Sequence, residues 1–347
     1  MKNVTAPSVF EKRARRKRIV FAIALIVLLV SFVCTCCIGR YPVTLADMVS
    51  AFGAGEKSMG ADVFLKIRLP RAFFSALCGM ALAVSGYAYQ ELFSNPLASP
   101  DVLGASAGAS VGASAAILAG ASGFFVSGAS LAGGLAAVAL AVILARLMGI
   151  RRGTGLILAG IVVKAVCDSV IMAFKYTADP DGTLAAIEYR LMGSFQTVRS
   201  ENIVVPTVMI IIPLIFLYAV RWRIQILTLG NDEAVSLGLS AGNLRILCIA
   251  AATIPAAASV SVTGVVAWTG LIVPHAVRFF AGDDFVKNFG ICALSGGVFM
   301  LWTDTAARSV SAAEIPISIL TSLLGALFLV AVLIQKNRFR AGSDDIR

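Results

Sequence analysis

Two charged residues inside an apolar segment are the side chains with the clearest potential for chemistry. Lys164 and Asp168 are four positions apart, which puts them on one face of a helix. A charge in hydrocarbon is costly, so each needs a partner or a wet cavity. Either the pair neutralises itself, or it lines a pathway and contacts a charged solute.

No residue set of a known catalytic or metal site accompanies them. The sequence has no G-x-x-x-x-G-K-[ST] phosphate loop, no H-E-x-x-H pair and no serine nucleophile elbow. His275 is the single histidine, and the C-x-x-C spacing from Cys34 to Cys37 has no second cysteine pair beside it. We therefore predict a chain that is not an enzyme and holds neither cofactor nor metal, with its seven cysteines buried in apolar segments.

The elements that carry these residues are membrane helices. The 347 residues are 59% hydrophobic and 14% charged, whereas a soluble domain is about half apolar and a quarter charged. A membrane span needs about 20 apolar residues. Ten segments qualify as candidate spans: 19–39, 70–92, 102–121, 124–148, 155–176, 203–220, 243–264, 266–280, 288–308 and 316–334.

The net charge of +10 is concentrated at the two ends of the chain. Basic residues precede the first apolar segment and follow the last, so the positive-inside rule predicts cytoplasmic termini rather than a nucleic-acid partner. The first segment is longer than the roughly 7–15 apolar residues of a signal peptide, which indicates a retained helix. We predict a basic tail over 1–18, one membrane domain over 19–335 and a second tail over 336–347.

The loops outside the membrane contain one exception to this charge pattern. Residues 40–69 include a short amphipathic helix predicted over 42–52, and the loop ends in Arg68-Leu69-Pro70-Arg71. A basic cluster on the outer side would be explained by an acidic docking partner. Residues 177–202 form a second outer loop, with a turn at 179–182.

Small residues predict one closely packed helix. Gly104, Gly108 and Gly112 recur every four residues, which lets helix backbones approach closely in lipid. This helix either only packs or also lines a pathway. Asn95-Pro96 and Val273-Pro274 form a faint repeat, as in transporters built from two inverted halves.

The loop over 221–242, predicted to be cytoplasmic, contains a short helix between two glycines. Asn231 or Asp232 is predicted as its N-cap and Gly238 as its end. Such a helix is either solvated or held by another protein.

Several motifs then resemble one family. The pattern from Leu229-Gly230 through Ala234 to Leu237-Gly238 is similar to the coupling loop of FecCD-type permeases, which import ferric siderophores, haem or cobalamin. Further motifs follow in the family's order between about 60 and 335: Leu158-Ala159-Gly160, Leu191-Met192-Gly193-Ser194, Gly270–Arg278, Asp304–Arg308 and Glu314–Ile317.

The resemblance implies an all-α polytopic membrane protein with ten transmembrane helices in two inverted five-helix halves, the type II ABC importer permease fold. It implies a second permease subunit, identical or paralogous, with ABC ATPase subunits on the cytoplasmic face. A substrate-binding protein would dock on the other face of a bacterial cytoplasmic membrane. The implied cargo is a ferric siderophore, with haem or cobalamin as alternatives.

The resemblance also implies roles for individual residues. Arg68, Arg71 and Arg308 would dock the binding protein, although Arg308 is also spaced for an ion pair with Asp304. The implied cytoplasmic gate is Asn95, Leu97 and Thr154, with Asn95 alternatively a turn residue. ATPase coupling would involve Leu229, Gly230, Glu233, Ala234, Leu237 and Gly238.

An ion-coupled secondary transporter is the competing hypothesis, and Lys164 and Asp168 are the only residues that favour it.

Overall fold

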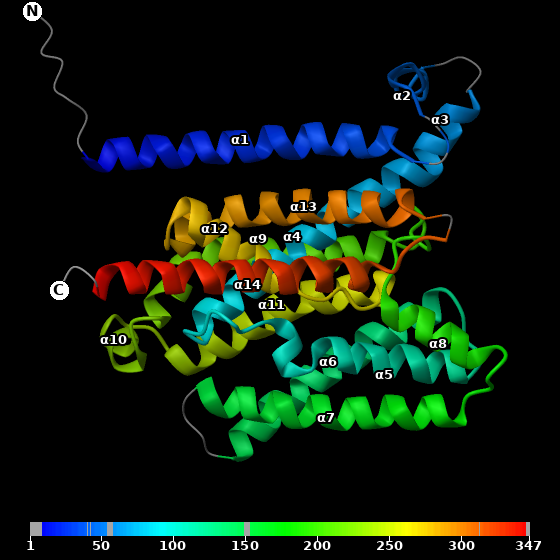
Figure 1. The fold of residues 1–347 in the computed structure, drawn as a ribbon. Coiled ribbons are helices and arrows are strands. Elements are labelled where there is room, and N and C mark those ends of the chain that lie inside the picture. Colours follow the sequence, from blue (N-terminus) through cyan, green and yellow to red (C-terminus); the bar gives the residue numbers. More distant parts are fainter. Residues whose placement is uncertain are drawn as a thin grey trace, which may run out of the picture.

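The computed structural model describes residues 9–39, 41, 43–53, 58–148, 153–311 and 313–344, and all regular structure in this part is helical. Figure 1 shows the long helices aligned along one direction, with the start of α1, the end of α14 and α10 at one end. We call this the α10 end, and we call the opposite end, which carries α2, α3 and α8, the α8 end. The helices are α1 (Val9–Cys37), α2 (Leu45–Ser50), α3 (Met59–Val63), α4 (Leu69–Leu92), α5 (Ala105–Leu118), α6 (Phe124–Leu147), α7 (Gly153–Thr177), α8 (Thr183–Met192), α9 (Val204–Leu227), α10 (Asn231–Ser236), α11 (Ala241–Thr263), α12 (Thr269–Ala281), α13 (Phe285–Ser309) and α14 (Ile317–Asp344), with a π-turn η1 (Phe64–Arg68) and a 3₁₀ turn η2 (Pro100–Leu103).

Every predicted apolar segment coincides with a helix. Among the described residues, seven helical stretches are long and apolar enough to cross a membrane, so the chain is a multi-pass membrane protein. The helices at the third, eighth and tenth predicted segments are α5, α12 and the apolar part of α14, and they are shorter or less apolar. Within the described residues, seven of the ten predicted spans therefore coincide with a helix of membrane-spanning length and hydropathy.

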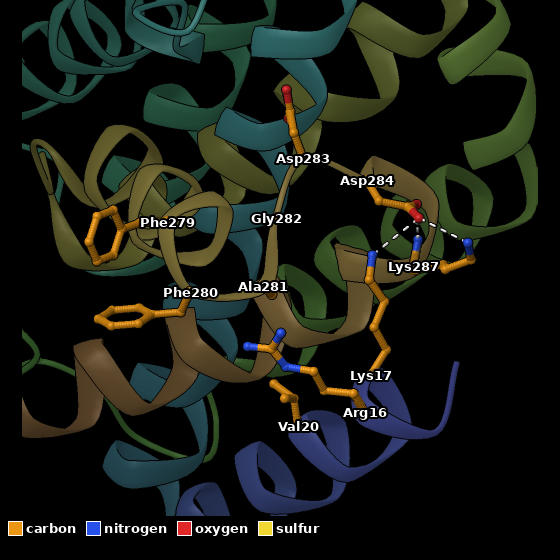
Figure 2. Close-up of a pocket in the computed structure, with 10 residues that line it drawn as sticks. All are labelled: Arg16, Lys17, Val20, Phe279, Phe280, Ala281, Gly282, Asp283, Asp284 and Lys287. Atoms are coloured by element: carbon orange, nitrogen blue, oxygen red, sulfur yellow. Dashed lines mark hydrogen bonds and ion pairs between the residues drawn. The ribbon is translucent and has the colours of Figure 1, made fainter. Parts of the chain in front are cut away.

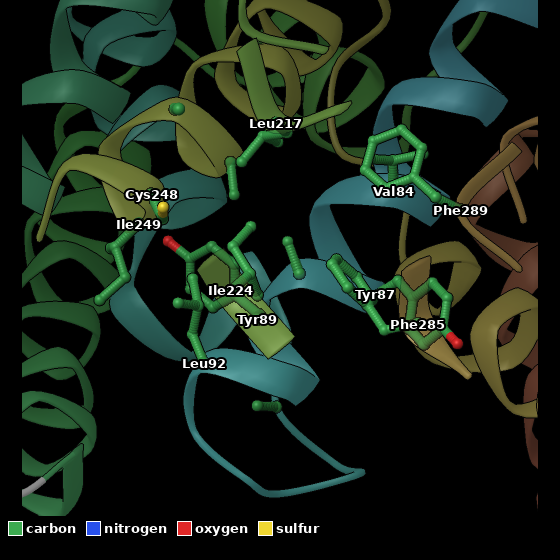
Figure 3. Close-up of a cluster of buried hydrophobic side chains, with 14 of the residues drawn as sticks. Val84, Tyr87, Tyr89, Leu92, Leu217, Ile224, Cys248, Ile249, Phe285 and Phe289 are labelled. Carbon is green, nitrogen blue, oxygen red and sulfur yellow. The ribbon is translucent and has the colours of Figure 1, made fainter. Parts of the chain in front are cut away.

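Helix α4 is the centre of the bundle because its small residues admit neighbouring backbones. A Cβ at Gly79 would lie 2.1 Å from the carbonyl oxygen of Gly296, and one at Gly86 would lie 1.9 Å from that of Gly270. Helix α4 therefore packs directly on α13 and α12, and it also contacts α11 and α9. Figure 3 shows the apolar cluster around it, with Tyr87 of α4 against Phe285 of α13.

The predicted close packing of the glycine-stepped helix is confirmed in α5. A Cβ at Gly108 would lie 2.5 Å from the carbonyl oxygen of Gly133 in α6, and Gly112 meets the carbonyl of Ala129. Gly104 is not part of this contact. It ends η2 with φ +78°, a left-handed conformation that favours glycine.

The loops at the α8 end contain one predicted helix and one that the sequence did not predict. Helix α2 lies within the predicted range, and Thr44 and Asp47 form a capping box at its start. The segment 177–202 was predicted as a loop, but it contains α8, ten residues long. The turn at 179–182 marked the start of α8, and the apolar residues after it were too few to indicate a span.

Helix α1 lies at the edge of the bundle, where it packs on α13 and α4. The basic residues 9–18 continue the same helix as the first apolar segment, and α14 likewise continues through the basic residues after 335. The two sequence tails are therefore largely helical extensions of spans.

Candidate functional site

A buried charge cluster occupies the α8 end. Arg71 of α4 makes an ion pair of 2.8 Å with Asp304 of α13 and a second of 2.8 Å with Glu314, which precedes α14. Its Nε and Nη2 atoms donate to the Asp304 carboxylate, while Nη1 and Nη2 donate to Glu314. One guanidinium thus joins three elements through charge-assisted hydrogen bonds.

The other two predicted docking arginines border this cluster. Arg68 donates to the carbonyl oxygens of Ile38, at 2.8 Å, and Tyr41. Arg308 donates to the carbonyl oxygen of Thr35 and forms the predicted ion pair with Asp304, at 3.8 Å. Both arginines therefore tie the end of α1 to the bundle.

The three arginines lie together at the α8 end, but each side chain is engaged within the chain. Arg68, Arg71 and Arg308 are at most 8% exposed. Docking on a partner would have to displace or share these internal bonds.

The predicted inner gate lies in the turn after α4. The side-chain oxygen of Asn95 accepts a hydrogen bond of 3.0 Å from the backbone N–H of Leu97, so Asn95 does act as a turn residue. Leu97 is 56% exposed. Thr154 lies in the first turn of α7, with its side chain outside the described part of the structure.

Helix α10 is attached at one point and exposed around it. Ala234 is fully buried in the cluster that contains Leu227 and Ala241, whereas Leu229, Val235 and Leu237 are each at least 60% exposed. The exposed residues give the α10 end a small apolar surface.

The termini of α10 correct one prediction and confirm another. The N-cap is Gly230 rather than Asn231 or Asp232, because the backbone there adopts φ +129°. A Cβ at Gly230 would also lie 2.2 Å from the Glu233 carboxylate. Gly238 follows the last turn with φ +78°, as predicted for the helix end.

The charges of α7 do not neutralise each other. Within the described residues, no ion pair joins Lys164 and Asp168. Lys164 is exposed and interacts electrostatically with Asp101, whose carboxylate accepts a hydrogen bond from Ser106. The apolar residues on the same helix, Leu158, Ile161, Val162 and Val166, are also exposed.

A second polar cluster, at the α10 end, was not predicted. Arg278 of α12 makes an ion pair of 3.1 Å with Glu91 of α4, donates to the side chain of Gln90 and lies over the Tyr87 ring. Arg278 ends the Gly270–Arg278 motif quoted above, but its contact with Gln90 spans 188 positions. Nothing local in the sequence signals it.

The cysteines are less uniformly buried than predicted. Cys36, Cys78, Cys248 and Cys292 are buried, while Cys34, Cys37 and Cys167 are partly exposed. Within the described residues they are free, and no group of three metal-ligand side chains gathers.

Comparisons with known proteins assign this architecture to a family. The model of the FecCD transport family matches residues 26–335. The molybdate import system permease protein MolB of Haemophilus influenzae is 32% identical over 333 residues, covering 94% of this chain and 98% of its own. A probable iron chelatin transport system permease protein of Helicobacter pylori is 32% identical over 280 residues, covering 81% and 85%.

A solved structure agrees over nearly the whole chain. It is titled as an inward-facing conformation of a metal-chelate type ABC transporter, and it matches with a TM-score of 0.83 and 31% identity, covering 92% of this chain and 99% of its own. The chain therefore belongs to the FecCD transport family and is a membrane permease subunit of an ABC importer, a transport component and not an enzyme.

Proposed function

We propose that this permease imports a ferric siderophore. The observation that carries the proposal is the agreement of two comparisons: the relative from Helicobacter pylori is named for an iron chelatin, and the solved structure is titled for a metal chelate. The relative named for molybdate makes an oxyanion the second candidate. Haem and cobalamin remain alternatives within the family.

We infer an orientation with the α10 end in the cytoplasm of a bacterial cell. Arg15, Arg16, Lys17 and Arg18 begin the first span at that end, and basic residues concentrate on the cytoplasmic side of membrane proteins. The proposed unit has ten spans over 19–335 in two inverted halves, with both termini cytoplasmic and the coupling loop over 221–242.

The proposed ATPase contact is α10 and the residues beside it. A short helix held by Ala234, with Leu229 and Leu237 exposed in a region outside the membrane, presents the kind of apolar patch that marks a protein contact. Motion of the ATPase subunits would move α10 and, through Ala234, the ends of α9 and α11.

The proposed docking face for the substrate-binding protein is the α8 end. Arg68 is the strongest candidate contact, because its guanidinium is bonded to backbone carbonyls rather than held by a carboxylate at ion-pair distance. An acidic side chain of the partner would supply the charge that those carbonyls lack. Arg71 and Arg308 would support this face through Asp304.

A second permease subunit is proposed to cover α7. Lys164 among exposed apolar residues is costly against lipid, so this face needs a wet or protein-covered environment. Lys164 and Asp168 would then border the central pathway, with Asn95, Leu97 and Thr154 at its inner end.

Uptake into membrane vesicles tests the function. The permease is combined with its ATPase and binding protein, and radiolabelled ferric siderophore, haemin, cobalamin and molybdate are supplied with and without ATP. We expect ATP-dependent uptake of the siderophore. Preferential uptake of molybdate would replace the cargo, and uptake that follows an ion gradient without ATP would support a secondary transporter.

The same assay tests docking. Arg68→Gln is expected to weaken binding of the loaded binding protein and to reduce uptake, whereas Lys66→Gln, an exposed neighbour, leaves both unchanged. If both variants lose binding and uptake equally, or if neither variant loses them, Arg68 is not a docking residue.

A further inference from the structure

An open groove lies between three helices, α1, α9 and α13, at the α10 end. It has a volume of about 450 Å³ and lies between the starts of α1 and α13 and the last turns of α9. We call it the basic groove, and its lining is Lys17, Arg18, Phe21, Tyr218, Arg221, Trp222, Val286, Lys287 and Gly290.

The lining of the basic groove includes four cations and, among the residues that the structure describes, no acidic side chain. Two of these cations, Lys17 and Lys287, each make an ion pair of 3.1 Å with Asp284, which lines the neighbouring cavity that Figure 2 shows. Arg18 and Arg221 form no ion pair with any carboxylate that the structure describes. The groove therefore has an unbalanced positive charge that favours an anion.

Arg221 and Arg18, which form no ion pair with a described carboxylate, differ in how they are positioned. Arg221 lies 3.8 Å from the centre of the Tyr218 ring and donates to the Tyr218 carbonyl oxygen. This leaves the remaining guanidinium N–H groups of Arg221 for a ligand, and several N–H donors in a fixed plane suit a phosphate. Arg18 is exposed on the facing helix, immediately before the apolar part of α1 begins.

Apolar side chains also line the basic groove, and they select the class of anion. Phe21 of α1 lies against Gly290 of α13, where a Cβ would be 2.7 Å from its ring. Trp222 is 58% exposed beside it, and exposed tryptophans concentrate at the headgroup level of membranes. A free inorganic anion would contact only the basic side chains, whereas a lipid would contact both the basic and the apolar side chains.

We propose that the basic groove binds an anionic phospholipid, with its phosphate between Arg18 and Arg221 and the start of an acyl chain on Phe21 and Trp222. Basic pockets between membrane helices are the usual sites for anionic headgroups. The proposal requires only that the chain spans a membrane, and it does not depend on the cargo or on the proposed orientation.

Native mass spectrometry of the purified, delipidated full-length permease tests the site. Phosphatidylglycerol is titrated, with phosphatidylcholine and inorganic phosphate as parallel titrants. We expect tighter binding of phosphatidylglycerol than of either. Arg18→Gln/Arg221→Gln is expected to weaken that binding about 25-fold, because each basic residue near a headgroup contributes about fivefold in affinity.

The control variant is Arg15→Gln/Arg223→Gln. It removes the same charge from the same two helices at exposed positions that do not line the basic groove, and its affinity should stay within about twofold of wild type. Equal weakening in both variants, or equal binding of phosphatidylcholine, would overturn the proposal.

A third variant separates a lipid from a free anion. Trp222→Ala keeps every charge and is expected to weaken phosphatidylglycerol but not inorganic phosphate. If phosphate alone competes fully and Trp222→Ala has no effect, the groove binds a free anion and the lipid proposal fails. Unfolding temperatures of all variants establish that each remains folded.

Discussion

At the scale of single residues, Arg71 links α4 to α13 and to the segment before α14 at the α8 end. It is buried, and its charge is balanced by the two carboxylates that it contacts, Asp304 and Glu314. A buried ion pair adds little net stability compared with apolar packing, but removal of one partner leaves a desolvated charge. The cluster is therefore sensitive to single substitutions.

Asp304→Asn is expected to lower the free energy of unfolding by about 3–5 kcal/mol, because Arg71 and Arg308 lose their shared counter-ion. Denaturant unfolding in micelles measures this change. Asp62→Asn, which removes an exposed ion pair with Lys66, should change it by less than about 1 kcal/mol. Similar values for both variants would mean that the buried cluster is not a stabilising contact.

Gly86 is a second residue with a sharp expectation. Gly86→Ala places a Cβ against the backbone of Gly270, and we expect a loss of about 1–3 kcal/mol as α4 and α12 separate. Gly128→Ala on α6 meets no atom within 4 Å and should be neutral or stabilising by up to about 1 kcal/mol. A stable Gly86→Ala variant would show that α12 is not held against α4. The measurement is the unfolding temperature of each purified variant.

At the scale of elements, the start of α13 is fixed by Asp284. Its side chain accepts a hydrogen bond of 3.1 Å from the backbone N–H of Lys287, which makes it the N-cap. Partial burial by itself raises the pKa of Asp284, but this hydrogen bond and the ammonium groups of Lys287 and Lys17 outweigh it and hold the pKa below its ordinary value of 3.8.

The sign of the pH dependence follows from that lowered pKa. The contribution of Asp284 is fully present above pH 3.8 and is lost as the pH falls through the lower folded pKa. The intrinsic rate of amide hydrogen exchange itself varies with pH. After correction for that variation, exchange in the first turn of α13 should become faster only below pH 3.8.

Asp284→Ala should give the faster exchange already at neutral pH, with a loss of about 1 kcal/mol. Asp283→Ala, whose side chain is 82% exposed, is the control. Unchanged exchange in Asp284→Ala would contradict the cap.

Helix α10 is the other element with a clear expectation. Leu237→Asp changes an exposed side chain, so stability should change by less than about 0.5 kcal/mol. ATP-driven uptake should nevertheless fall at least about tenfold if α10 is the ATPase contact, since a charge then enters an apolar interface. Uptake and ATPase copurification measure the effect. The control is Val49→Asp, which places the same charge at an exposed apolar position of α2, at the other end of the bundle. Normal uptake in Leu237→Asp would exclude this surface.

At the scale of the whole molecule, α7 has an exposed face on which charged and apolar side chains have no covering element from the same chain among the described residues. Lys164 and the partly exposed Asp168 are not paired with each other. Asp168→Asn is expected to change the ratio of uptake rates of two differently charged chelates by about fivefold, the effect of about 1 kcal/mol. Ser169→Ala, its exposed neighbour, should leave the ratio unchanged. If uptake of every chelate falls in proportion to protein abundance, Asp168 does not border the pathway.

Local sequence properties determined the helices, the membrane environment and the family. Hydropathy and segment length are properties of consecutive residues, and each predicted apolar segment is indeed a helix. The glycine spacing of α5 likewise predicted that this helix packs closely on a neighbour, which is α6. Helix α8 was missed because ten amphipathic residues lack the length that marks a span.

Only the tertiary structure decided which distant residues meet. Arg71 and Glu314 are 243 positions apart, and Arg278 and Gln90 are 188 apart. Such pairs depend on which helices lie side by side, and the backbone contacts of Gly79 and Gly86 set that arrangement. Arg71 and Arg308 are consequently buried against carboxylates of their own chain, because α4, α13 and the start of α14 converge at the α8 end.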